Sequence, residues 1–306
     1  MNGIHAVKPL TIGSRGSQLA RWQANYIASR LQQLGIASRI EIIRTTGDHL
    51  QTASLVQAGG KGLFTKEIED ALLAGSIDLA VHSLKDLPTE MPKGLCIAAI
   101  PEREDPRDAL VGARLSELPP NAGVGTSSGR RAAQLLVLRP DLRIESVRGN
   151  VDTRLRKLKE RKYHAIVLAA AGLRRLGLES EITELLDPEQ LCPAPGQGAL
   201  AIETRDNDEA FAICRQLNHE ISCQAVLCER AALARLGGGC QLPVGAFAEV
   251  AGGGSLRLTT VVVSPDGSRH LRASAEGPRE RPAELGELVA EDLLSRGAGA
   301  ILSEIK

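Results

Sequence analysis

Two stretches of the chain repeat one order of elements, in which a short apolar strand leads through a polar turn into an amphipathic helix, and this repetition constrains the fold most. In the first stretch, residues 10–13 predict a strand, and residues 18–34 predict a helix that ends at Gly35. In the second, residues 122–125 and 130–138 repeat the pattern. Strands that alternate with helices are typical of α/β units with parallel strands. The sequence therefore predicts two such units.

The other elements predicted for these units continue the alternation. Residues 47–62 interrupt the first unit with several glycines and no apolar period, so we predict a mobile loop there that acts as a lid. Residues 101–106 and 193–198 contain prolines and are predicted to be linkers. The remaining predicted elements are strands at residues 39–44, 77–82, 143–147 and 165–169 and helices at residues 65–74 and 151–160.

The last third of the chain has a different pattern. A helix predicted over residues 222–236 ends at three consecutive glycines. Strands joined by short turns follow, and such strands pair antiparallel. The sequence therefore predicts a small α+β domain, with strands at residues 244–250, 256–264 and 269–275 and a closing helix at residues 283–295.

Composition and charge weigh against several classes of protein. A chain of 306 residues is too long for one ordinary core, so two or three domains are expected. The 37 basic residues balance the 37 acidic ones, and aromatic residues make up only 2%, which disfavours a nucleic-acid-binding protein. No segment reaches the roughly 18 consecutive apolar residues of a membrane span, and residues 1–10 lack an apolar signal stretch. We therefore expect a cytoplasmic protein with free thiols.

Two of the strand-to-helix turns carry arginine side chains. Residues 13–17 include Arg15, and residues 125–131 include Arg130 and Arg131. A helix N-terminus attracts anions, and guanidinium groups beside it indicate that an anion lies near. The second turn is neither a dinucleotide-binding fingerprint nor a Walker loop, because its glycine spacing differs from both. The turns therefore predict sites for an anionic ligand, with a plain capped turn and a surface charge pair as the alternatives.

Arg148 and Arg154 flank another strand-to-helix junction, where α/β folds place ligands. Five more basic residues follow on the predicted helix and just beyond it. We interpret these five as a solvated helix face and leave them outside the site; they are Arg156, Lys157, Lys159, Arg161 and Lys162.

Lys85 and Asp86 follow the carboxyl end of the apolar strand predicted at residues 77–82. A carboxylate in this position can stabilise a cationic intermediate or move a proton. From the residues alone, an ordinary surface pair of Lys85 and Asp86 is favoured. His82 is predicted to be a strand histidine with satisfied hydrogen bonds rather than a ligand.

Cys240 follows three glycines, Gly237 to Gly239. Glycines cost conformational entropy, so this loop suits a thiol that must reach a ligand or carry an adduct better than a structural cysteine. The cysteines lack the spacing of zinc fingers, and no metal site is expected. The other cysteines are interpreted as core or helix-packing residues.

Taken together in their order along the chain, seven short motifs resemble the porphobilinogen deaminase family. The resemblance extends from about residue 10 to residue 267 and is loose beyond it. One departure lies at Gln57, where some relatives carry a lysine, so a salt bridge of that loop is not expected here. The motifs are residues 59–64, 80–86, 102–108, 124–128, 147–150, 195–198 and 238–241.

The resemblance implies two α/β domains like those of periplasmic binding proteins around a cleft, plus a small α+β C-terminal domain with an antiparallel sheet. The first domain would comprise residues 1–101 and 198–218, the second residues 102–197 and the third residues 219–306. It also implies a transferase of tetrapyrrole (heme) biosynthesis, expected to be a monomer. This enzyme joins four porphobilinogen molecules head to tail on a dipyrromethane cofactor, releases ammonia at each step and frees hydroxymethylbilane by hydrolysis.

Site residues follow from the resemblance position by position. Cys240 matches the cysteine that carries dipyrromethane as a thioether, and Asp86 matches the catalytic acid. Further cofactor contacts are expected at Lys85, Asp86, Ser128, Arg130, Arg131, Arg148 and Gly149. Substrate contacts are expected at Arg15, Ser17, Phe64, Arg148, Arg154, Arg175 and Gln197. These cations suit porphobilinogen, because each ring carries an acetate and a propionate.

Two other functions remain open from the sequence. A two-lobed receptor for a small anion would explain the doubled turns, although it would leave Cys240 on its glycine loop unexplained. Binding of RNA or DNA through residues 148–162 is disfavoured by the neutral net charge.

Overall fold

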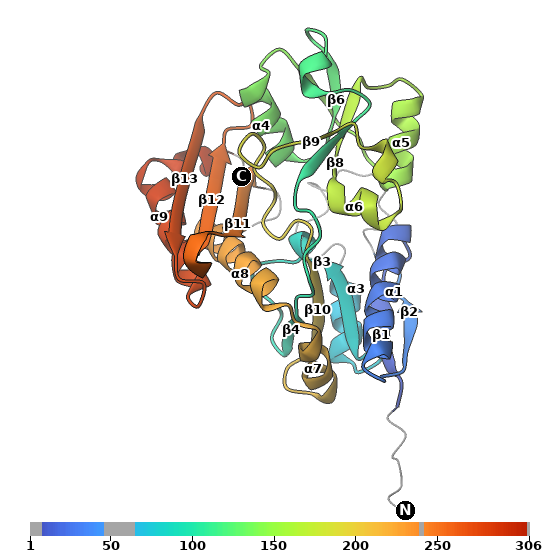
Figure 1. Ribbon diagram of the computed structural model, residues 1–306. Coiled ribbons are helices and arrows are strands. Elements are labelled where there is room, and N and C mark those ends of the chain that lie inside the picture. Colours follow the sequence, from blue (N-terminus) through green and yellow to red (C-terminus); the bar gives the residue numbers. More distant parts are fainter. Residues whose placement is uncertain (1–7, 46–64, 239–241, 305–306) are drawn as a thin grey trace, which may run out of the picture. The chain divides into compact units, whose positions relative to one another are not determined.

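The computed structural model describes residues 8–45, 65–238 and 242–304, and these residues form two compact units (Figure 1). The predicted loop at residues 47–62, Phe64 and Cys240 lie outside the described residues. No helix among the described residues is long and apolar enough to cross a membrane.

The first unit comprises the described parts of residues 1–83, 90–102 and 200–219. Its strands are Leu10–Ser14 (β1), Ser38–Ile42 (β2), Leu79–Ser83 (β3), Leu95–Ala99 (β4) and Leu200–Arg205 (β10). They form one sheet in the order β2-β1-β3-β10-β4. The predicted parallel pairing holds for β1 with β2 and β3, but β10 runs antiparallel to both of its neighbours, so the sheet is mixed.

Helices of the first unit bury one face each against this sheet. They are Gln18–Gln33 (α1), Lys66–Leu73 (α3) and Glu209–Cys214 (α7). The Ser17 hydroxyl caps α1 by accepting a hydrogen bond from the Ala20 N–H at 3.2 Å. Gly35 adopts a φ of +77° just after the helix, which confirms the predicted helix end.

A second sheet lies in the other unit. Its strands are Asp108–Val111 (β5), Gly123–Gly125 (β6), Arg143–Glu145 (β7), Ala165–Ala169 (β8) and Glu184–Leu185 (β9). They follow the order β7-β6-β8-β5-β9, and β5 runs antiparallel to β8 and β9. The helices beside this sheet are Gly129–Leu138 (α4), Val151–Lys159 (α5) and Ala170–Arg175 (α6).

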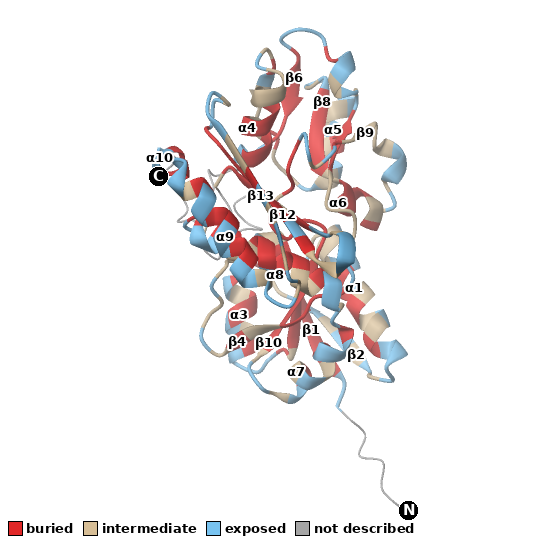
Figure 2. Ribbon diagram, turned by 60° about the vertical axis from the view of Figure 1, so that its left-hand side comes forward, coloured by how far each residue is buried: buried red, intermediate tan, exposed pale blue. Residues whose placement is uncertain are grey.

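The C-terminal part of the same unit confirms the predicted antiparallel α+β arrangement. Its strands are Val244–Val250 (β11), Leu256–Val263 (β12) and His270–Gly277 (β13), and its helices are Glu220–Arg235 (α8), Pro282–Ser295 (α9) and Ala298–Ser303 (α10). The strands pair antiparallel in sequence order. Figure 2 shows buried residues along α8, which packs against α9 and β11. One apolar cluster joins these helices and the sheet.

Residues 103–106 and 193–198 of the two predicted linkers run side by side within this unit. The Glu104 N–H donates to the Gly198 carbonyl at 3.2 Å, and the Gln197 side-chain amide donates to the Pro106 carbonyl at 2.7 Å. Gly198 has a φ of +85°, and a Cβ there would lie 2.2 Å from the Glu104 carbonyl oxygen. Only glycine therefore permits the close approach of these segments. The division into three domains with the boundaries given above stays a prediction.

Candidate active site

Lys85 and Asp86 lie in a short 3₁₀ turn, Leu84–Asp86 (η1), which follows β3 in the chain. Leu84 is buried and anchors the turn, because its N–H donates to the Ala199 carbonyl at 3.0 Å and its side chain lies against Gly196. Asp86 itself is exposed. The turn therefore holds a carboxylate at the surface on a firmly packed base.

The segment after Asp86 is bound by a side chain from α8. The guanidinium of Arg230 donates to three backbone carbonyls, those of Leu87 at 3.4 Å, Pro88 at 2.6 Å and Thr89 at 3.2 Å. At Gly238, just after α8, a Cβ would lie 2.8 Å from the Thr89 hydroxyl. The helix that precedes Cys240 in sequence therefore contacts the segment that carries Asp86.

Asp108 is the buried centre of the charged cluster. Its carboxylate accepts hydrogen bonds from Arg130 at 2.7 Å, Arg131 at 2.8 Å and the Gln197 amide at 2.9 Å. Burial alone would raise the pKa of Asp108, but the two guanidiniums and these hydrogen bonds outweigh it and hold the pKa well below its usual range. An ionised carboxylate therefore lies fully buried between the two arginines.

This arrangement excludes one of the alternatives given for the turn at residues 125–131, a surface charge pair. Arg130 and Arg131 are buried, so they are not a surface charge pair, and an internal anion, Asp108, faces both. Asp108 was not among the predicted site residues, although it ends the motif at residues 102–108. Ser128 caps α4, because its hydroxyl accepts from the Arg131 N–H at 3.4 Å.

Gln197 links Asp108 to Lys85. Its side-chain oxygen accepts from the Lys85 amine at 3.3 Å and from Arg131 at 3.5 Å, while its amide nitrogen donates to Asp108. Burial and the nearby positive charges of Arg131 and Arg130 lower the pKa of Lys85 to about 8, against the opposite effect of Asp86 and Asp108. The amine is therefore held in an environment with surplus positive charge.

Arg154 adds another cation to the cluster. Its Nε donates to the Gly149 carbonyl at 2.8 Å, and Gly149 has a φ of +113° that favours glycine. Burial, together with repulsion from Arg131, lowers the pKa of Arg154 to about 10, although Asp86 opposes the change. Arg131, Asp86 and Arg154 therefore lie within electrostatic reach of one another, as the predicted site requires.

The other predicted site residues lie in several places. Arg148 is half-buried at the turn before α5. Arg175 is buried, and its guanidinium donates to the Gly198 carbonyl at 2.6 Å. Arg15 and Ser17 belong to the first unit. His82 is buried in β3, which confirms its place in the strand, and its Nε2 lies 2.9 Å from the carboxylate of Glu203.

The charge of the cluster indicates its ligand. Among the described residues, four cations (Lys85, Arg130, Arg131 and Arg154) accompany two carboxylates, Asp86 and Asp108. The lowered pKa values of Lys85, Arg131 and Arg154 reflect burial and, in each case, repulsion by another cation. A ligand that bears several carboxylates would supply the missing negative charge, and lysine and arginine bind carboxylates well. The residues present therefore fit a polycarboxylate.

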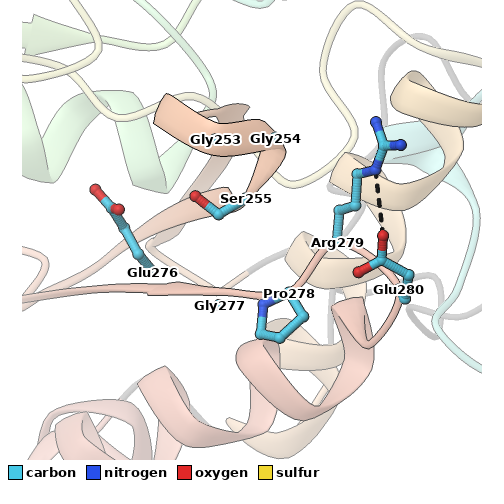
Figure 3. Close-up of a pocket in the computed structure, with 8 residues that line it drawn as sticks. All are labelled: Gly253, Gly254, Ser255, Glu276, Gly277, Pro278, Arg279 and Glu280. Carbon is cyan, nitrogen blue, oxygen red and sulfur yellow. Dashed lines mark hydrogen bonds and ion pairs between the residues drawn. The ribbon is translucent and has the colours of Figure 1, made fainter.

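A hollow of about 590 Å³ lies elsewhere, in the C-terminal part (Figure 3). It is lined by residues 253–255 and 276–280, and the side chains of Arg279 and Glu280 at its rim pair at 3.4 Å. None of the predicted site residues lines it, so it is separate from the charged cluster.

Two family models match most of the chain. Residues 10–212 match the family model described as "Porphobilinogen deaminase, dipyromethane cofactor binding domain", and residues 223–295 match "Porphobilinogen deaminase, C-terminal domain". The porphobilinogen deaminase of Pelobacter propionicus is 51% identical over 306 residues, with 97% of each chain covered. That of Shouchella clausii is 50% identical over 308 residues, with 98% of each chain covered.

Solved structures give a more distant likeness. A periplasmic substrate-binding protein of an ABC transporter from Coxiella burnetii is 14% identical with a TM-score of 0.43, and covers 72% of this chain and 94% of its own. An ancestral cationic amino acid solute-binding protein is 16% identical with a TM-score of 0.40, and covers 68% of this chain and 87% of its own.

The two family models together span most of the chain, and the curated relatives match it over nearly its whole length at about half identity. The motifs that first suggested the family include the Lys85–Asp86 turn and the segment at residues 102–108, which ends at Asp108 of the charged cluster. From these agreements we conclude that the chain belongs to the porphobilinogen deaminase family.

Proposed function

We propose that the chain is a hydroxymethylbilane synthase, which condenses four porphobilinogen molecules head to tail on a covalently bound dipyrromethane and then releases the product by hydrolysis. The observation that carries this proposal is the surplus of cations, two of them buried and two half-buried, beside the exposed carboxylate of Asp86. Each pyrrole ring brings an acetate and a propionate, so a growing chain matches that surplus. Dipyrromethane, when bound, supplies the free ring carbon to which the first porphobilinogen is joined.

The chain's own residues have distinct tasks in this proposal. Three cations bind the carboxylates of the rings and so orient the rings; they are Lys85, Arg131 and Arg154. The hydrogen bond that the Lys85 amine donates to Gln197 fixes the direction of this amine. Loss of ammonia from porphobilinogen leaves a cationic pyrrole. Asp86 stabilises that positive charge and accepts the proton lost when the new carbon–carbon bond forms.

Intact-mass measurement tests the proposal. The purified chain should exceed the mass of its sequence by two pyrrole rings, and added porphobilinogen should produce further one-ring increments and hydroxymethylbilane. An unmodified chain that leaves porphobilinogen unconsumed would instead support the two-lobed anion receptor. Our expectations that the protein is cytoplasmic and monomeric stay predictions.

Cofactor assembly should slow at alkaline pH because of Lys85. Its pKa of about 8 in the protein without ligand means that the amine loses its charge, and its attraction for carboxylates, as the pH rises through that value. We expect the rate at which cofactor-free protein gains the two-ring adduct to be constant below about pH 7 and to fall as the pH rises through about 8. Lys85→Arg, which keeps its charge, should show no fall up to about pH 9.5. Identical pH profiles for the two proteins would contradict this role.

Arg154→Leu or Arg148→Leu should arrest elongation partway. A charge-assisted hydrogen bond contributes about 1.5–3 kcal/mol, so losing one should weaken binding of the chain at a given stage by roughly tenfold to a hundredfold. Mass spectrometry after addition of porphobilinogen should show intermediates accumulating at particular ring counts.

Arg156→Leu is the matched control for Arg154→Leu, because Arg156 lies on the same helix but is exposed and reaches Glu160 at 3.9 Å. It should give the wild-type ladder. If Arg154→Leu also gave the wild-type ladder with normal product release, Arg154 would not hold the growing chain. Failure to acquire any cofactor would place its role in cofactor assembly.

A further inference from the structure

Lys157 differs from the basic residues around it on and just beyond α5. The exposed Lys159 pairs with Glu181 at 2.9 Å, and the exposed Lys162 pairs with Glu160 at 2.9 Å. Lys157 is instead half-buried, and its amine donates to the backbone carbonyl of Arg148 at 3.0 Å. Lys157 is therefore not part of the solvated helix face to which the sequence analysis assigned it.

The turn that receives this hydrogen bond is attached to α5 at three successive residues. The Arg148 carbonyl accepts from Lys157, and the next carbonyl, that of Gly149, accepts from Arg154 at 2.8 Å. The Asn150 side chain then caps the helix by accepting from the Thr153 N–H at 2.9 Å. The backbone also lies close against the helix, because a Cβ on Gly149 would be 2.6 Å from the Thr153 methyl group.

This attachment fixes the backbone of Arg148, from which the side chain extends. An arginine has many rotamers, and binding a carboxylate with it costs less when its backbone is already held in place. A hydrogen bond from a charged amine to a carbonyl is among the stronger ones in proteins. Loss of the Lys157 amine should therefore loosen the Arg148–Gly149 turn without removing any group that touches a ligand.

We propose that Lys157 is a positioning residue of this enzyme, which acts on the growing chain only through the Arg148–Gly149 turn. The inference rests on the proposed function, in which Arg148 binds carboxylates of that chain. It adds to the site a side chain that neither the family's motifs nor the sequence pattern single out.

Lys157→Met and Lys159→Met form a matched pair of variants, since both remove one amine from the same helix. Lys157→Met should lower kcat/KM for porphobilinogen about tenfold, mostly through KM, because one charge-assisted hydrogen bond is lost. Lys159→Met should stay within about twofold of wild type, as expected for a surface ion pair. Lys157→Arg should recover most of the loss.

A double-mutant cycle tests whether Lys157 acts through Arg148. In the Arg148→Leu background, Lys157→Met should have little further effect, because the amine still holds the backbone carbonyl but the guanidinium that the turn positions is already absent. Fully additive losses would mean that the amine acts elsewhere and would overturn the proposal, as would equal kinetics of Lys157→Met and Lys159→Met. An inactive wild-type protein would overturn the proposed function and the inference with it.

Hydrogen exchange supplies a readout that does not depend on turnover. Amides in a peptide spanning residues 147–152 should exchange faster in Lys157→Met than in wild type, and the Lys159→Met protein should match wild type. Unchanged exchange in Lys157→Met would show that the amine does not hold the turn, even if its activity fell. Exchange raised across the whole of both units would indicate global destabilisation and would likewise overturn a local role.

Discussion

Asp86→Asn is expected to fold normally and to lose turnover by about a hundredfold or more. The substitution keeps the shape of the side chain, and Asp86 is exposed in η1, so the packing of Leu84 beneath it is preserved. Only the negative charge is removed. Groups that stabilise charge in a transition state or transfer a proton typically contribute factors of about 10² to 10⁴, so the rate of ring addition should fall steeply while cofactor content is retained.

Asp152→Asn is a suitable control, because Asp152 is also an exposed aspartate of the same unit, in the first turn of α5. It should retain near-normal kcat. A second readout follows from the charge itself. Asp86 raises the pKa of Lys85, so Asp86→Asn should shift the alkaline fall in cofactor assembly to a pH below 8. A folded Asp86→Asn protein with near-normal kcat would exclude the catalytic role.

Cys240→Ser is expected to yield a protein with the mass of its sequence and no detectable synthase activity. Cys240 lies outside the described residues, but four of the described cysteines are poorly suited to carry the cofactor. Burial raises the pKa of Cys192, Cys214 and Cys228 to about 12 and that of Cys96 to about 11. These groups remain protonated thiols, and the thiolate is the nucleophile.

Cys223→Ser is the control for the anchoring cysteine, because Cys223 lies on α8 and is partly exposed. The Cys223→Ser protein should keep the two-ring adduct and its activity. The intact masses of both variants show which of them carries the adduct, and peptide mapping of the wild type shows which cysteine is modified. An adduct that survives in Cys240→Ser and disappears in Cys223→Ser would assign the thioether to Cys223.

Local sequence patterns determined most of the regular elements of this chain. The predicted strand at residues 165–169 coincides with β8 and that at residues 244–250 with β11, because an apolar or alternating run bounded by turn residues requires only neighbouring residues. The helix starts at Ser17 and Ser128 were likewise predictable, since a capping hydroxyl acts on the next turn.

Elements that depend on distant partners escaped prediction. β10 pairs antiparallel with β3 and β4, although the whole second sheet lies between them in sequence, and β5 is a four-residue strand whose partners β8 and β9 come much later. The alternation of strands and helices predicted parallel pairing only. Nothing local to residues 200–205 indicates which strands they join or in which direction.

The candidate site, too, was predictable from the sequence only in part. The sequence identified Lys85, Asp86, Arg130 and Arg131 by their motifs, but only the tertiary structure brought Asp108 between the two arginines and linked it through Gln197 to Lys85. It also separated Lys157 from the exposed lysines around it. The sequence determines which side chains can carry a charge. The free energy of each charge depends on its burial and on distances to other charges, which only the folded chain determines.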